Sequence, residues 1–450
     1  MGLIHPLQIW GGIECTVNRV GDAFFDQLEY SGHARRLRDL DVTAELGLKT
    51  LRYPVLWERT EGPTGELDFA WSDQRLMRLQ ELGIDPIVGL LHHGSGPART
   101  SLLDPEFPQK LASYAACVAE RYPFVTRFTP VNEPLTTARF SGLYGHWYPH
   151  ARDDRSFVRA LLNQCKGTIL AMAAIRRHIP DAQLIQTEDL GFTRSTETLG
   201  YQADFENERR WLSFDLLCGR MSSRHPLYNY LRRSGATPSE LGFFEQHPCA
   251  PDVLGLNYYI TSERFLDDRL QHYPAREIGG NGRRRYVDVE AVRVCAEGIV
   301  GPGRLLLQAE HRYGLPLAIT EAHLGSSVDQ QQSWFAYVWQ SALGARELGA
   351  DIRAVTVWAL LGAYGWDRLV TQGRGNYEPG AFSVAGGAVH LTPYYHWLRE
   401  LVRGKPRAVV PGWWTLPDRL LYEPYMPRGQ VVPARPSSSV EPGQAAVAVG

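Results

Sequence analysis

The chain has 450 residues, of which 44% are hydrophobic, and its formal net charge is −2 at pH 7. This near-neutral charge argues against a surface built to bind nucleic acid or an anionic membrane, and the apolar fraction is ample for a large globular core. The six cysteines are scattered without CxxC spacing, which argues against a zinc site or a dense disulfide framework. The N-terminus does not resemble a signal peptide and no apolar stretch reaches 18 residues, so the sequence predicts a cytoplasmic protein.

Short apolar runs, typical of buried strands, alternate with amphipathic segments along most of the chain. In chain order, strands are expected at 7–12, 50–55, 86–92, 125–133, 183–189, 252–259, 317–321 and 354–360. Helices are expected at 33–46, 72–82, 105–121, 155–177, about 204–233, 287–313, 330–348 and 393–402, with Ser72 as an N-cap and Gly47 and Gly83 as helix ends. The first strand is followed by Gly11 and Gly12 without the third glycine of a dinucleotide-binding fingerprint, which disfavours a doubly wound nucleotide-binding sheet. Eight strand–helix units in strict alternation predict an α/β protein with a single (β/α)8 barrel over residues 1–425.

The fourth predicted strand ends at an Asn–Glu pair, Asn132 and Glu133, with a proline directly behind it. Barrel enzymes gather their catalytic groups at such carboxyl-terminal strand tips, which come from distant parts of the chain. Other predicted tips carry Glu188 and Asp189 on the fifth strand and Glu321 on the seventh. The fourth and seventh strands lie across the barrel from each other, so Glu133 and Glu321 are placed to flank a bond, as the two carboxyl groups of a glycosidase do. Taken alone, each acid could equally be a solvated residue at a strand end.

Five polar or aromatic side chains fall at or near the tips of the second, third, fourth, sixth and eighth predicted strands. Each alone has a structural reading, such as an ion-pair partner, a satisfied core histidine or a core aromatic ring. Together they predict a surround for the two carboxylates, because an arginine keeps a neighbouring carboxylate ionised and a tyrosine hydroxyl orients it. These residues are Arg52, His92, Asn132, Tyr259 and Trp358.

The motifs around these residues resemble those of family 1 glycoside hydrolases, the β-glucosidase and β-galactosidase group. Residues 131–134 resemble the acid/base motif of that family, and residues 319–321 resemble its nucleophile motif. The combination is more specific than any one motif, and the resemblance covers roughly residues 7–403. Further segments similar to the family are 45–57, 142–145 and 254–259.

The resemblance implies a retaining β-glycosidase that acts on a small-molecule glycoside or oligosaccharide without a metal or organic cofactor. Glu133 would be the acid/base and Glu321 the nucleophile, supported by Arg52 and Tyr259. Asn132 would contact the sugar 2-hydroxyl, where a hydrogen bond strengthens toward the oxocarbenium-like transition state. Further contacts with the glycon would come from His92 and Trp358.

The chain departs from the family where the far side of the glycon is bound. Trp366 is retained, but Gly365 stands where the family has a glutamate that grips the sugar 4- and 6-hydroxyls. Such polar contacts set large specificity ratios, so simple β-glucosides and β-galactosides are expected to be poor substrates. Further departures are Asn18 for a first-strand glutamine, His93 for a tryptophan, and Ala322 and His323 for an Asn–Gly pair; candidate replacements for the lost glutamate are Asp367, His93 and His323.

Three other readings remain open. A metal-dependent barrel hydrolase using His92 and His93 is disfavoured, because successive side chains of a strand point to opposite faces. A catalytically silent sugar-binding barrel or scaffold would not need a nucleophile held in its ionised form. A transglycosylase would differ only in whether an acceptor sugar or water resolves the intermediate.

From about Met426 the composition shifts to proline, serine, valine and alanine, which predicts a flexible tail or linker over residues 426–450. In chains that resemble this one, such a stretch can lead into a nucleotide-sugar reductase-like domain. A downstream domain in a longer chain is therefore a further expectation.

Overall fold

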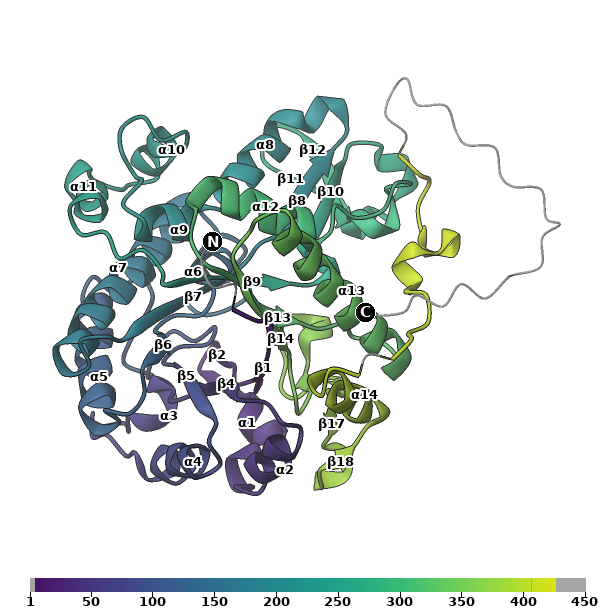
Figure 1. The fold of residues 1–450 in the computed structure, drawn as a ribbon. Helices are drawn as coiled ribbons and strands as arrows, with labels where there is room; N and C mark the ends of the chain where they lie inside the picture. Colours follow the sequence, from purple (N-terminus) through teal and green to yellow (C-terminus); the bar gives the residue numbers. More distant parts are fainter. Residues whose placement is uncertain (1–4, 406, 426–450) are drawn as a thin grey trace.

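The computed structural model describes residues 5–405 and 407–425. Within these ranges eight parallel strands close into a barrel, with the last strand pairing back to the first (Figure 1). This confirms the predicted (β/α)8 barrel. The expected tail over residues 426–450 lies outside the described residues. In order around the barrel the strands are β1 (Gln8–Gly12), β4 (Thr50–Pro54), β5 (Asp85–Gly89), β6 (Arg127–Thr129), β7 (Gln183–Asp189), β9 (Val253–Tyr258), β13 (Leu317–Ala322) and β14 (Ile352–Val357).

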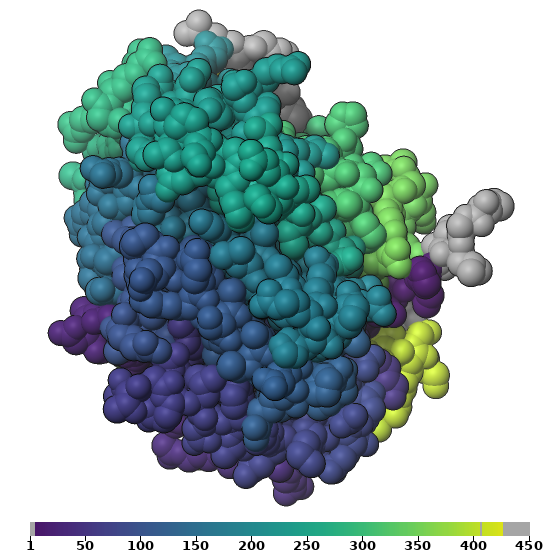
Figure 2. Space-filling view, turned by 90° about the vertical axis from the view of Figure 1, so that its left-hand side faces the viewer, coloured from purple at the N-terminus to yellow at the C-terminus, as the bar shows by residue number. Residues whose placement is uncertain are grey.

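Helices between the strands form an outer layer around the barrel (Figure 1). Figure 2 looks onto the side covered by segments coloured blue to teal, which include α5 and α7. The predicted helix ends at Gly47 and Gly83 are confirmed, because both glycines have the positive φ of a helix C-terminus, 92° and 65°. Among the described residues, no helix combines the length and the apolarity that crossing a membrane requires. The outer helices are α2 (Asp39–Glu45), α4 (Ala70–Glu81), α5 (Phe107–Arg121), α7 (Asp154–His178), α12 (Pro302–Tyr313), α13 (Val328–Glu347) and α14 (Pro393–Val402).

The barrel interior is apolar toward the amino-terminal ends of the strands. One buried residue from each of five strands contributes to this cluster, and each lies among the first three residues of its strand. Apolar side chains therefore fill the barrel interior toward the amino-terminal ends of the strands. Polar groups lie at the carboxyl-terminal ends, as in other barrels of this kind. The cluster consists of Trp10, Ile87, Ile185, Ala318 and Ala354.

The predicted helix over 287–313 is wrong in its first half. Residues 285–290 form strand β12 (Arg285–Glu290), in which buried and exposed positions vary along the strand, and the helix begins only at Pro302. The burial pattern of β12 does not alternate strictly, and its antiparallel pairing with β10 makes this segment a strand. The result is a four-stranded sheet that the sequence analysis did not predict, formed by β8 (Phe192–Ser195), β10 (Glu263–Asp267), β11 (Gly279–Gly280) and β12.

Other predicted helices begin elsewhere or are divided. Ser72 is not an N-cap: α4 begins at Ala70, and the Asp68 carboxylate accepts a hydrogen bond from the Ala70 backbone N–H instead. The segment 33–46 consists of a 3₁₀ turn (His33–Arg35) followed by α2. The irregular region about 204–233 contains separate helices α8 (Gly200–Arg209), α9 (Leu212–Leu217) and α10 (Tyr228–Arg233), followed by α11 (Pro238–Gln246).

Candidate active site

Glu133 lies past the end of its barrel strand. β6 ends at Thr129, four residues earlier than predicted, and Asn132 then forms an isolated parallel bridge with His92. Glu133 adopts a left-handed backbone conformation, with φ 47° and ψ 64°, and is directly followed by helix α6 (Pro134–Ala138). A non-glycine residue in this conformation costs about 1–3 kcal/mol, which the surrounding structure must offset. Such strain is found where the position of a side chain matters.

Glu188 fixes the start of α6 and thereby the position of Glu133. Its buried carboxylate accepts hydrogen bonds from the backbone N–H groups of Leu135 and Thr136, at 2.8 and 3.2 Å, and from the Ser213 hydroxyl at 2.7 Å. The Thr136 hydroxyl donates to this carboxylate as well, at 3.1 Å. Glu188 is thus a supporting residue of the site. Its neighbour Asp189 accepts a hydrogen bond from the Ser262 hydroxyl.

Glu321 is held on both carboxylate oxygens. Arg52 Nη1 donates to Oε1 at 2.8 Å and also to the backbone carbonyl of Thr320 at 2.7 Å, and the Tyr259 hydroxyl donates to Oε2. β13 has an irregular register between Ile319 and Glu321, so the strand is not uniform where it delivers this side chain. The structure thus brings together Arg52, Tyr259 and Glu321, as predicted.

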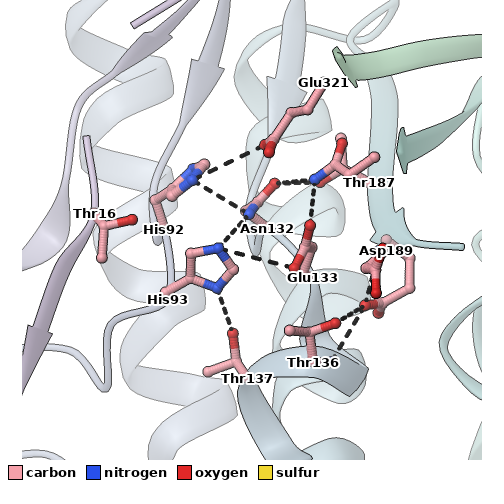
Figure 3. A network of polar contacts seen from close by, with 12 residues as sticks. Thr16, His92, His93, Asn132, Glu133, Thr136, Thr137, Thr187, Asp189 and Glu321 are labelled. Atoms are coloured by element: carbon pink, nitrogen blue, oxygen red, sulfur yellow. Dashed lines mark hydrogen bonds and ion pairs between the residues drawn. The ribbon is translucent and has the colours of Figure 1, made fainter. Parts of the chain in front are cut away.

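Asn132 joins the two catalytic candidates. Its Oδ1 accepts hydrogen bonds from Arg52 Nη2 at 2.8 Å and from the Thr187 hydroxyl at 2.7 Å. Figure 3 shows Glu133 and Glu321 on either side of Asn132. Asn257 Nδ2 donates to Glu133 Oε1 at 2.6 Å, a contact that sequence reasoning missed although the residue lies in a motif already noted.

The two consecutive histidines both face this cluster. His92 Nε2 lies 4.0 Å from Glu321 Oε1, and His93 Nε2 lies 3.8 Å from Glu133 Oε2 (Figure 3). The expectation that they point to opposite faces is wrong, because β5 ends at Gly89 and His93 has a left-handed φ of 59°. Even so, no group of three or more His, Cys, Asp or Glu side chains in the described ranges is arranged to hold a metal ion.

Two tryptophans form a wall beside the histidines. The Trp358 ring stacks on His92, with centroids 5.2 Å apart, and the Trp366 ring lies 5.4 Å from His93. Both indole Nε1 groups donate toward Glu14 Oε2, at 3.3 and 3.2 Å. Sequence reasoning missed Glu14, because an acid in the connection after the first strand carries no signal of its own.

Three further predicted site residues, Asn18, His323 and Asp367, make contacts of their own. Asn18 is buried and donates to the carbonyl of Val370 at 2.9 Å. His323 pairs with Glu378 at 2.9 Å. Asp367 accepts a hydrogen bond from Asn376 at 2.7 Å, and its side chain is 32% exposed. Asp367 directly follows Trp366 in the same 3₁₀ turn, and the pairing of His323 with Glu378 engages the His323 Nε2 atom. The role of these two residues in place of the missing glutamate stays a prediction.

The two carboxyl groups differ in their tendency to ionise. Burial, together with the charges of Glu321 and Asp189, raises the pKa of Glu133 well above its ordinary value. Burial also raises the pKa of Glu321, to about 7, although the Arg52 guanidinium and the Tyr259 hydroxyl favour its charged form. Arg52 and Tyr259 thus favour the ionised form of Glu321, whereas the negative charges around Glu133 favour its protonated form. This is the division of roles that an acid and a nucleophile require.

A bell-shaped dependence of kcat/KM on pH is expected, with its acid limb near pH 7. Activity rises with pH as Glu321 ionises, at a pKa of about 7, and falls again when Glu133 loses its proton at higher pH. Because the two groups interact, the limbs report on the pair. Measuring kcat/KM from about pH 4 to about pH 10 checks this expectation, and an optimum near pH 5 would contradict it.

The chain is similar in sequence to known β-glucosidases and phospho-β-glucosidases. No protein-family model matches the chain. A 6-phospho-β-glucosidase of Dickeya chrysanthemi is 24% identical over 277 residues, which is 57% of this chain and 58% of that protein. An aryl-phospho-β-D-glucosidase of Bacillus subtilis (strain 168) is 22% identical over 332 residues, 65% of this chain and 68% of that protein. The chain thus matches just under three fifths of the length of the first of these relatives.

Solved structures with the same fold cover nearly the whole barrel. The β-glucosidase of Thermotoga maritima in complex with deoxynojirimycin has a TM-score of 0.70 at 17% identity, covering 89% of this chain and 98% of that one. The same enzyme in complex with cyclophellitol has a TM-score of 0.70 at 18% identity, covering 90% and 99%. The chain therefore has the (β/α)8 barrel fold of these β-glucosidase structures, and in sequence it is similar to curated β-glucosidases and phospho-β-glucosidases.

Proposed function

We propose that the protein is a retaining β-glycosidase that hydrolyses a small-molecule β-glycoside or oligosaccharide. The observation that carries this proposal is Glu321, held on both oxygens by Arg52 and Tyr259, together with the buried carboxyl of Glu133, whose pKa is raised by burial and by the charge of Glu321. Protonation by one group and attack by the other account for both chemical steps, so we infer no cofactor. We further propose that the enzyme acts in the cytoplasm, and that residues 426–450 link it to whatever follows in a longer chain.

In the first step Glu133 gives its proton to the glycosidic oxygen while a Glu321 oxygen attacks the anomeric carbon. The bond to the leaving group breaks, and a covalent glycosyl–Glu321 ester forms. In the second step Glu133, now a carboxylate, takes a proton from water, and the resulting oxygen displaces Glu321 from the anomeric carbon. Two displacements at one carbon restore its original configuration, so the product keeps the β configuration.

Asn132 is placed to assist both steps. Its Oδ1 is occupied by Arg52 and Thr187, which orients the amide so that Nδ2 faces the histidine side of the site. An amide held in this way is ready to donate to a sugar 2-hydroxyl, where a hydrogen bond strengthens as positive charge develops on the ring. Preorganisation by protein contacts avoids the cost of orienting the group during the reaction.

The arrangement also argues against a catalytically silent sugar-binding barrel. Glu321 is buried, and its ionised form loses favourable contact with water. This burial, together with the second buried carboxyl of Glu133 nearby, destabilises the fold at neutral pH. A binding site for neutral hydroxyl groups does not need this cost. A transglycosylase would use the same two residues, and the choice between water and an acceptor sugar depends on substrates.

A panel of activated aryl β-glycosides tests the proposed function. The panel includes gluco, galacto, 6-deoxy and 6-carboxy sugars, each assayed with wild type and with Glu321→Ala. We expect at least one glycoside to be hydrolysed by wild type, with plain β-glucosides among the poorer substrates, and the first-formed sugar to be the β anomer in NMR spectra. A first-formed α anomer, or equal rates for wild type and Glu321→Ala, would exclude the proposed mechanism.

A further inference from the structure

Glu14 is a buried carboxylate that the catalytic steps do not use. It lies in the short connection between β1 and β2 (Val17–Val20) and is 3% exposed. Its Oε1 accepts the backbone N–H of Thr16 at 2.8 Å, and its Oε2 receives the two indole N–H groups of Trp358 and Trp366 at 3.3 and 3.2 Å. A carboxylate has about four acceptor positions, so further donors can still bind to it.

The position of Glu14 places it within the electrostatic field of the catalytic pair. Burial is the main cause of the raised pKa of Glu321, and the charge of Glu14 adds to it. The same holds for Tyr259, where burial comes first, the charges of the catalytic pair follow and that of Glu14 contributes as well. A chain of contacts joins Glu14 to the reaction centre: the Trp358 indole donates to Glu14 and stacks on His92, and His92 Nε2 lies 4.0 Å from Glu321 Oε1.

Two unpartnered oxygen atoms lie on the same short segment. Thr16 Oγ1 and Asn18 Oδ1 are buried and have no hydrogen-bond partner among the described residues. Figure 3 shows the Thr16 oxygen directed toward the side where His92 and His93 lie. Each of these two oxygens can therefore still accept a hydrogen bond from a donor that enters the site.

We propose that Glu14, together with Thr16, binds hydroxyl groups of the glycon at the end remote from the anomeric carbon. This rests on the proposed function, because the anomeric carbon must lie between Glu133 and Glu321. In this chain, a carboxylate that follows β1 would then bind the remote sugar hydroxyl groups, which the family binds with a glutamate that follows β14. Because the carboxylate approaches the sugar from another strand, it meets the hydroxyl groups from another direction, which agrees with an altered glycon specificity.

The backbone explains why position 365 itself does not carry the carboxylate. Gly365 has a left-handed φ of 71°, and a Cβ added there would lie 3.1 Å from the carbonyl oxygen of Arg374. The loop also packs closely at Gly375, where an added Cβ would meet the Gly365 Cα at 2.4 Å. A side chain at either position would strain this loop. A carboxylate for this subsite must therefore come from elsewhere.

The chemistry of this subsite indicates an uncharged glycon. The negative charge of Glu14 would repel a phosphate or carboxylate at the remote end of the sugar. Burial lowers the pKa values of both His92 and His93, so these neighbours are neutral and offer no compensating positive charge. The subsite therefore favours a neutral, hydroxylated sugar over a phosphorylated one, unlike the substrates in the names of two of the relatives.

The test compares the loss of a sugar hydroxyl with the loss of the Glu14 charge. kcat/KM is measured for the best neutral glycoside of the panel, its 4-deoxy and 6-deoxy analogues and its 6-phospho analogue. The variants are wild type, Glu14→Gln, Thr16→Val, and Glu120→Gln as a matched control, since Glu120 is exposed on α5. Labelling of Glu321 by a 2-deoxy-2-fluoro glycosyl fluoride reports on the reaction centre of each variant.

In wild type and Glu120→Gln, loss of at least one remote hydroxyl is expected to lower kcat/KM by about 10- to 100-fold, the range for a hydrogen bond to a charged group. In Glu14→Gln the same loss should cost less than about 3-fold, and the preference for neutral over 6-phospho substrate should shrink by at least about 10-fold. Thr16→Val is a smaller change. It should also reduce the deoxy penalty, meaning the fold loss of kcat/KM when a remote sugar hydroxyl is removed, but by less than Glu14→Gln does.

Two results would overturn the inference. Equal deoxy penalties in wild type, Glu14→Gln and Thr16→Val would show that this segment supports the fold without reading hydroxyl groups. A wild-type preference for the 6-phospho substrate would show that Glu14 does not face the glycon. If Glu321 is labelled in these cases, the proposed function stands and the inference about Glu14 alone fails; if no sugar labels Glu321, both fail together.

Discussion

Turnover of an activated aryl β-glycoside is expected to fall by at least about 10⁴-fold when Glu321 is replaced by alanine. In the proposed mechanism the replaced carboxylate forms the bond to the anomeric carbon, so no other residue takes over its role. Glu133→Ala is expected to behave differently. With a good leaving group the first step needs little acid assistance, so the glycosyl–enzyme accumulates and its slow hydrolysis limits the rate.

Added azide separates the two roles by the stereochemistry of its product. In Glu321→Ala a small anion can occupy the space of the lost carboxylate and attack from the same side, giving an α-glycosyl azide. In Glu133→Ala azide replaces the activated water and attacks the glycosyl–Glu321 ester from the other side, giving a β-glycosyl azide. NMR spectra of the isolated azides distinguish the two outcomes.

Asp367→Asn is a suitable control for this pair of variants. Asp367 is a partly exposed carboxylate on the loop after β14, and it contacts Asn376 and Arg368. Its replacement is expected to change kcat/KM by less than about 3-fold, since surface charges of this kind contribute little. If azide gave the same anomer with both glutamate variants, the assignment of the two roles would be wrong.

Replacing Arg52 with methionine is expected to lower kcat/KM at pH 7 by about 10²–10³-fold. Arg52 donates to both Glu321 and Asn132, and each hydrogen bond to a charged group is worth about 1.5–3 kcal/mol. Without the guanidinium the pKa of Glu321 rises further above 7, so the acid limb of the pH profile moves to higher pH. Tyr259→Phe removes a single contact and should move the limb in the same direction by less.

The same variant, Arg52→Met, is also expected to change how the free energy of unfolding depends on pH. A carboxyl whose folded-state pKa is raised contributes stability below its unfolded pKa, and this contribution is lost as the pH rises through the folded pKa. Glu321 is such a group, and Arg52→Met raises its folded pKa further. The free energy of unfolding should therefore fall little at about pH 5, and the loss should grow as the pH rises above about 7, because folding must then keep Glu321 protonated or bury it as an unpaired charge. Equal losses at both pH values would show that packing, and not charge, accounts for the role of Arg52.

The barrel and the core of the site could be predicted from the sequence because both depend on local pattern. Buried strands are continuous apolar runs, and a polar residue that ends such a run lies at the mouth of the barrel. Arg52, Tyr259 and Glu321 follow this rule and meet as expected. The rule does not depend on the lengths of the loops or on how far apart the strands lie in the chain.

The parts that could not be predicted depend on contacts between distant segments. Glu14 is drawn to the site by two indole N–H groups from residues more than 340 positions away, which no local pattern reveals. His93 turns toward Glu133 because of its backbone conformation, and strand alternation gives the opposite expectation. β12 becomes a strand because β10 pairs with it, in a segment whose composition also suits a helix.

Covalent trapping tests the central claim most directly. A 2-deoxy-2-fluoro glycosyl fluoride slows the second step more than the first, so a retaining enzyme accumulates as the glycosyl ester. Mass spectrometry of the intact protein and of its peptides is expected to show a single added sugar, located on Glu321, and none on Glu321→Ala. A label on a different residue, or no label with any sugar of the panel that wild type hydrolyses, would contradict the assignment of Glu321 as the nucleophile.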